Sequence, residues 1–142
     1  MKLECQIEKI KNSITLVERI TGKNLTLPVL GSVLLVAEGK YLKLRSTNLS
    51  IGIEISVPAK IDKEGTIAIR GDILSPLFSI LSGDGTASLE IIENNLSVKT
   101  KSNNILLKSV PYEDFPTIPV IKGENLTIPS KKFTEGIKSV YY

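Results

Sequence analysis

Two spacings of apolar residues follow one another along the first half of the chain. Between residues 7 and 20 the apolar residues fall three or four positions apart, which places them on one face of a helix. From residue 50 to 57 polar and apolar residues alternate, as in a strand with one buried face. The pattern predicts a helix at 7–20, which Gly22 is placed to end, and strands at 2–6 and about 30–37, 40–46 and 49–57.

The same order of elements then occurs a second time. A short strand at 66–69 and a helix at roughly 72–82 precede strands predicted at about 86–92, 95–101 and 104–110. A third round begins with a strand-like segment at 124–128 and a helix for which Ser130 is a good N-cap. Because the helix starts lie about 60 to 65 residues apart, the sequence indicates an internal repeat of strand–helix–three-strand units.

The positions of the prolines indicate a domain junction and raise a question about the second helix. The segment 110–124 holds three prolines, which predicts a junction between a first domain at 1–121 and the start of a second domain at 122–142. We therefore expect the chain to be part of a longer protein. Pro76 interrupts the second helix, so this helix either begins at Ser75 with Pro76 as its first residue or is kinked at Pro76.

The composition is that of a globular protein with little catalytic equipment. The 142 residues are 42% hydrophobic and 23% charged, and the net charge of +3 permits a polyanionic partner without requiring one. The chain has no histidine and a single cysteine, Cys5, which argues against histidine-based catalysis and a zinc site. We expect a cytoplasmic protein that is not an enzyme, binds no cofactor or metal and has no membrane segment.

Polar side chains occupy the face of the first predicted helix that lies opposite its apolar residues. Lys9, Asn12 and Arg19 belong to this face, and Lys23 continues it at the corner after the helix. A helix packed on a sheet needs a solvated face, and solvation alone accounts for such a pattern. Alternatively, these cations contact a phosphate backbone without reading bases. Since aromatic platforms for single strands are missing, the partner would then be a duplex, bound without sequence specificity and weakened by salt.

The last strand of the second unit is apolar on both faces. Ile105 and Leu107 share one face, while Leu106 and Val110 share the other. A strand of an antiparallel sheet usually has one polar face, so two apolar faces indicate burial on both sides. Either a helix of the same domain or a partner chain could cover the second face.

Four segments of the chain resemble one family of bacterial proteins. They are "LTLPVLGSVLLVA" at 25–37, "STNLSIGIEISVPAKI" at 46–61, "SVPYEDFPTIP" at 109–119 and "LTIPSKKFTEGIKSV" at 126–140. With these segments the chain resembles the amino-terminal part of the sliding clamp, the beta subunit of DNA polymerase III.

The resemblance implies a fold and a function. The fold is the α+β DNA-clamp fold, in which each domain is built from two strand–helix–three-strand units with the helices on one side of antiparallel sheets. Three such domains form a subunit, and two subunits form a homodimeric ring around double-stranded DNA. The ring is a processivity factor that tethers the replicative polymerase; the polymerase and the clamp loader bind through regions mostly outside this chain.

The resemblance also assigns roles to particular residues. Lys23 and Asn24 occupy the corner that faces DNA in the family, and Arg70 stands where the family often has basic residues at the start of the second helix. Lys9, Asn12 and Arg19 would add phosphate contacts along the first helix. Ile105 and Leu107 match apolar positions at the subunit interface, which favours a partner chain as the cover of that strand.

Two other classes of function are compatible with the sequence. A protein-interaction module without DNA contact would expose Ile105 and Leu107 and leave the helix cations solvated. A catalytic domain is the least supported class, because histidine and clustered carboxylates are absent.

Overall fold

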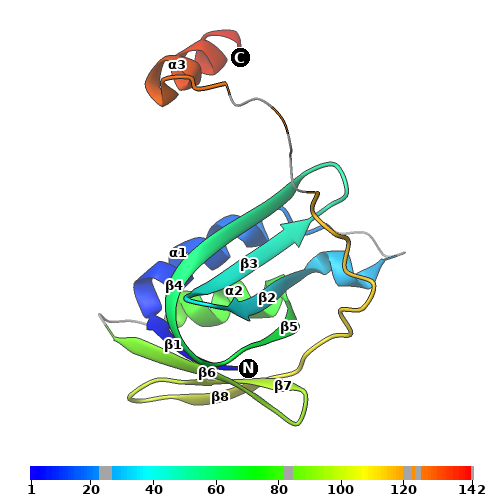
Figure 1. The fold of residues 1–142 in the computed structure, drawn as a ribbon, viewed down its shortest axis with the longest axis vertical. Helices are drawn as coiled ribbons and strands as arrows, with labels where there is room; N and C mark the ends of the chain where they lie inside the picture. Colours follow the sequence, from blue (N-terminus) through cyan, green and yellow to red (C-terminus); the bar gives the residue numbers. More distant parts are fainter. Residues whose placement is uncertain (23–26, 82–84, 120–122, 124–125, 142) are drawn as a thin grey trace.

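The structure is a computed structural model of the 142-residue chain, and it describes residues 1–22, 27–81, 85–119, 123 and 126–141. Figure 1 shows the order of its elements. The first unit consists of β1 (Lys2–Gln6), α1 (Ile7–Glu18), the short 3-10 helix η1 (Pro28–Gly31), β2 (Ser32–Glu38), β3 (Tyr41–Thr47) and β4 (Gly52–Lys63). The second consists of β5 (Gly65–Arg70), α2 (Gly71–Ile80), β6 (Thr86–Ile92), β7 (Asn95–Lys99) and β8 (Asn104–Leu107). A further helix, α3 (Ser130–Val140), follows.

The strands form one antiparallel sheet with the order β5-β2-β3-β4-β1-β6-β7-β8. We join the two ends of this order, so that β8 is followed by β5. The resulting circular order stays the same when β1 to β4 are replaced in turn by β5 to β8 and the reverse. The ring is closed between β5 and the residues after β8 by a single bridge, in which the Val110 N–H donates to the Ala68 carbonyl at 3.0 Å. The sheet therefore confirms the predicted repeat of two strand–helix–three-strand units.

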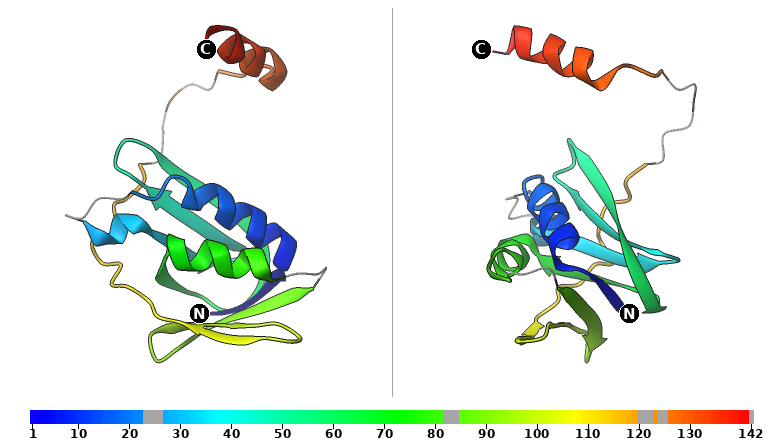
Figure 2. Two further views of the ribbon diagram at one scale, coloured as in Figure 1. Left: turned by 180° about the vertical axis from the view of Figure 1, so that it is seen from behind. Right: turned by 90° about the vertical axis from the view of Figure 1, so that its left-hand side faces the viewer.

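Both helices of the repeat cover the same side of the sheet. Figure 2 shows α1 and α2 lying side by side on this side. The periodic apolar residues of α1 and two large residues of α2 are fully buried against the strands; they are Ile10, Ile14, Val17, Leu74 and Phe78. The helical spacing read from the sequence thus identified the face of α1 that forms the core.

Glycine allows the two helices to meet closely at one end. A Cβ atom on Gly71, the first residue of α2, would lie 3.2 Å from side-chain atoms of Glu18 and Thr21. At the opposite end, the Lys11 ammonium donates to the Ser79 carbonyl at 2.9 Å. The helices therefore run antiparallel, with the start of α2 beside the end of α1.

Several element boundaries differ from the prediction. α1 ends at Glu18, before residue 20, and β8 ends at Leu107, before residue 110. β4 begins at Gly52 and continues to Lys63, so the strand predicted at about 49–57 was right over 52–57 but began and ended too early. Leu49 lies in a turn with a φ of 75°, which keeps it out of the strand. α2 begins at Gly71 with Pro76 inside it, so the alternative start at Ser75 was wrong.

The described residues between β8 and α3 contain little regular structure. Residues 126–128 are not a strand, and residues 124–125 of the predicted strand lie outside the described residues. None of the residues of α3 is buried, although its apolar residues are periodic. In the described part of the chain, every helix is too short or too polar to cross a lipid bilayer.

Candidate nucleic-acid interface

The exposed side of α1 carries the polar residues that the sequence singled out. Lys9, Asn12 and Arg19 are exposed, while Ile10 and Val17 are buried. At about 100° of rotation per residue, the three exposed residues fall within about 80° of one another around the helix axis. Arg19 caps the helix in a helical conformation and so continues the same face. We call Lys9, Asn12, Leu16 and Arg19 the α1 stripe; Leu16 is an apolar member with 51% exposure.

The two cations of the α1 stripe are free of ion pairs within the described residues. The ion pairs found there join Lys2 to Glu90, Lys43 to Glu38, Arg45 to Glu54 and Arg70 to Asp72. Lys11 is not a member of the stripe. Its ammonium donates to the Ser79 carbonyl at the carboxyl end of α2, where a cation also stabilises the helix dipole. The Lys9 and Arg19 charges thus remain available to an anionic partner.

Arg70 lies next to this surface but its charge is already compensated. Its Nε donates to Asp72 Oδ1 at 3.0 Å, and its terminal nitrogen donates to the second carboxylate oxygen. The hydrogen bonds from Arg70 hold the pKa of Asp72 below its usual range, and the same bonds raise the pKa of Arg70. Because Arg70 immediately precedes α2, it lies at the end of the helix pair where α1 finishes near Arg19.

The exposed face of α2 provides no cation of its own. Its exposed residues are Asp72, Ile73, Pro76, Ser79 and Ile80. The helix contains no lysine or arginine. Within the helix pair formed by α1 and α2, the positive charge therefore comes from α1, while Arg70 is paired with Asp72. Lys23 and Asn24, which the sequence analysis placed at the adjacent corner, lie outside the described residues.

Hydrogen bonds with β3 and with η1 fix the end of α1. The Ser46 hydroxyl of β3, which is fully buried, donates to the Val17 carbonyl at 2.5 Å. The Gly22 N–H donates to the Leu30 carbonyl at 2.8 Å. These bonds position Arg19 and the exit of the helix relative to the sheet. The sequence analysis missed Ser46, although a serine at a position of β3 that alternates with buried leucines was a usable signal.

The two faces of β8, the strand of the predicted subunit interface, differ in how far they are buried. Leu107 is buried in the core of this chain and Ile105 is partly buried against it, whereas Leu106 on the other face is 60% exposed. In this chain the face that carries Ile105 and Leu107 packs largely on the chain's own core, and the contact of these residues with a partner subunit stays a prediction. β8 is also the last strand of the sheet and pairs only with β7 along its length, among the described residues.

Comparison with known proteins identifies the family. A family model described as "DNA polymerase III beta subunit, N-terminal domain" matches residues 1–119. The chain belongs to this family. Among curated relatives, the beta sliding clamp of Synechocystis is 29% identical over 152 residues, covering 100% of this chain and 39% of the relative. The beta sliding clamp of Pseudomonas aeruginosa is 31% identical over 134 residues, covering 93% of this chain and 36% of the relative.

Solved structures of the family have the same fold. The crystal structure of the DNA polymerase III subunit beta from P. aeruginosa matches 97% of this chain and 38% of that chain, with a TM-score of 0.88 and 28% identity. The Caulobacter crescentus pol III beta structure matches 84% of this chain and 32% of that chain, with a TM-score of 0.78 and 26% identity. The predicted α+β clamp fold is confirmed. The chain spans about a third to two fifths of the length of these relatives.

Proposed function

We propose that this chain is the amino-terminal part of a DNA polymerase processivity factor, a sliding clamp that encircles duplex DNA. The observation that carries the proposal is the α1 stripe, whose two cations form no ion pair with any described residue and lie on the helix side of a clamp-fold sheet. Encirclement retains the ring by topology, so the contacts to phosphates need only be weak and independent of sequence. Such a ring would act in the cytoplasm, where it would tether the polymerase.

Further contacts belong to the same proposal. Lys23 and Asn24 would extend the α1 stripe at its corner, and Arg70 would join it when released from Asp72. The polymerase and the clamp loader would bind mostly outside this chain. Ring closure into a homodimer would use the free backbone edge of β8, with Ile105 and the rim of Leu107 as apolar contacts.

The proposed domain boundary, with 1–121 as the first domain and 122–142 as the start of the second, is supported by the pattern of α3. Phe133, Ile137 and Val140 have the same spacing as Ile10, Ile14 and Val17 of α1. All three residues of α3 are at least 50% exposed, whereas their counterparts are fully buried. An amphipathic helix of this kind needs a sheet of its own, which a second domain would supply.

The test uses the full-length protein loaded on nicked circular DNA. We expect retention on the circle and rapid loss after the circle is linearised. Replacing both Lys9 and Arg19 by alanine should weaken binding equally on all sequences and reduce the log–log salt slope by about 0.9 for every phosphate that is no longer neutralised. The double change Lys99→Ala with Lys101→Ala, which removes two exposed lysines at and after the end of β7, is the matched control. Equal retention on linear and circular DNA would contradict encirclement, and no retention on either would favour the protein-interaction module.

A further inference from the structure

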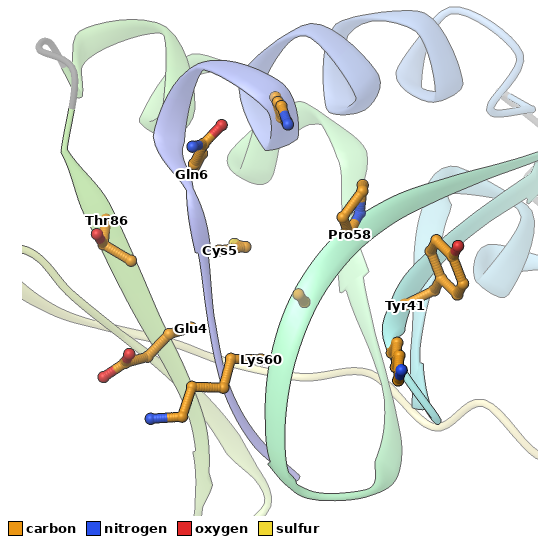
Figure 3. A pocket seen from close by; sticks show the side chains of 10 residues that line it. Glu4, Cys5, Gln6, Tyr41, Pro58, Lys60 and Thr86 are labelled. Carbon is orange, nitrogen blue, oxygen red and sulfur yellow. The ribbon is translucent and has the colours of Figure 1, made fainter.

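A notch opens where β4 leaves β1 and turns toward β3. The last residue pair between β1 and β4 is Cys5–Ala59, and the adjacent residue of β4, Pro58, is already paired with Tyr41 of β3. The notch has a volume of about 520 Å³, which is large enough for several side chains. In Figure 3 Tyr41 and Pro58 lie on one side of it, while Gln6 and Thr86 lie on the other.

The surface of the notch is apolar where it is deepest. Burial of the Cys5 side chain raises the pKa of its thiol to about 12, so this part of the wall is uncharged at neutral pH. Ala59 lies beside it, and Pro58 lacks a backbone N–H. Tyr41 remains 48% exposed although it borders this apolar wall. An exposed aromatic ring beside a proline is a platform on which an apolar side chain of a partner can pack.

Positive charge surrounds this platform. Lys9, Lys40 and Lys60 line the notch together with one carboxylate, Glu4, and these lysines form no ion pair with any described residue. Two further carboxylates near the notch, Glu38 and Glu64, already have partners within this chain. Glu38 binds Lys43 at 2.6 Å, and Glu64 accepts a hydrogen bond from the Gly39 N–H at 2.9 Å. The notch therefore presents a net positive rim that an acidic partner would complement.

We propose that this notch docks an acidic peptide segment of a partner protein, with one apolar side chain seated on Tyr41 and Pro58. A DNA duplex presents charged phosphates on its outside and has no apolar side chain to pack on Tyr41 and Pro58. A single strand would stack its bases on successive aromatic rings, and among the described residues Tyr41 is the one aromatic side chain that lines the notch. The proposal goes beyond DNA encirclement, because Lys40, Tyr41 and Lys60 lie on or beside strands, and of the notch residues only Lys9 belongs to the α1 stripe.

The experiment titrates the full-length protein into a fluorescein-labelled peptide of aspartate and glutamate residues with one central phenylalanine. Fluorescence anisotropy should show saturable binding that weakens as salt is raised. The double change Lys40→Glu with Lys60→Glu should weaken binding about tenfold, and Tyr41→Ala about threefold. The matched control, Lys99→Glu with Lys101→Glu, makes the same charge change elsewhere on the exposed surface and should leave binding unchanged.

Hydrogen exchange on the unmodified protein gives a second measurement that does not depend on the folding of a variant. Added peptide should protect the backbone amides of residues 40–41 and 59–60. Absence of saturable binding, equal weakening by the control, or equal binding of a peptide with serine in place of phenylalanine would overturn the proposal. So would a loss of duplex DNA binding in the Lys40 and Lys60 variant as large as that caused by changing Lys9 and Arg19, because the notch would then be a nucleic-acid contact.

Discussion

Replacing Asp72 by asparagine is expected to strengthen binding of duplex DNA. Asp72 holds Arg70 through two hydrogen bonds at the start of α2, and α2 itself contains no other cation. The substitution removes the charge that fixes Arg70 and also removes a repulsive charge from the helix face. Asparagine has nearly the same shape and retains a side-chain oxygen that can accept hydrogen bonds, so the start of the helix should be preserved.

The size of the effect follows from exposure and from the number of phosphate contacts. Both side chains of the pair are 58% exposed, so solvent screens their attraction and Arg70 can be released at little cost. If Arg70 then contacts one phosphate, the log–log salt slope should become steeper by about 0.9. Together with the loss of repulsion, we expect an affinity gain of about three- to tenfold at moderate ionic strength.

A double-mutant cycle separates the two contributions. DNA affinity of the full-length protein is measured by anisotropy over a range of salt for the unmodified protein, Asp72→Asn, Arg70→Ala and the double variant. In the Arg70→Ala background, Asp72→Asn can only relieve repulsion, so the gain should be smaller and the salt slope should not steepen. An equal gain in both backgrounds, or no gain from Asp72→Asn in a protein that otherwise binds DNA, would refute the release of Arg70.

Three further predictions concern stability. Ile14→Ala removes a fully buried side chain between α1 and the sheet, and should lower the free energy of unfolding by about 2–5 kcal/mol in urea titrations. Ser46→Ala removes the hydroxyl donor to the Val17 carbonyl and should cost about 0.5–1.5 kcal/mol in the same assay, with faster hydrogen exchange at the end of α1. The hydrogen bonds from Arg70 lower the pKa of Asp72 in the folded state, so this pairing stabilises the fold at pH values above the unfolded-state pKa of about 3.9. The stabilisation is lost as the pH falls through the lowered pKa. Asp72→Asn should therefore make the free energy of unfolding fall less steeply with pH in the acid range.

The repeat of two units could be predicted because its buried faces are periodic. Ile10, Ile14 and Val17 fall at helical spacing, and the alternation in β4 has the period of a strand. Boundaries were less predictable because they depend on contacts across the sheet. β4 extends past Pro58 because residues after it pair with β1, and those pairs involve residues more than 50 positions apart in the sequence.

The candidate sites differ in how far the sequence could predict them. The exposed face of a single helix determines the α1 stripe, so Lys9, Asn12 and Arg19 could be grouped from spacing alone. The notch combines residues of β1, α1, β3, β4 and β6, and no local pattern brings these together. The cover of β8 was also unpredictable, because whether Leu107 faces its own core or a partner depends on how the second unit folds back on the first.

The two units have kept one fold but have diverged in the surfaces of their helices. α1 and α2 occupy equivalent places in a strand order that is unchanged when the units are exchanged, so both present a face away from the sheet. The face of α1 has two cations that pair with no described residue, whereas that of α2 has an exposed acid, a proline and two isoleucines. Both helices still bury large apolar residues against the sheet, which are Ile10, Ile14 and Val17 in α1 and Leu74 and Phe78 in α2. Under the proposed function, this difference makes α1, and not α2, the helix of the pair that supplies cations to the DNA phosphates.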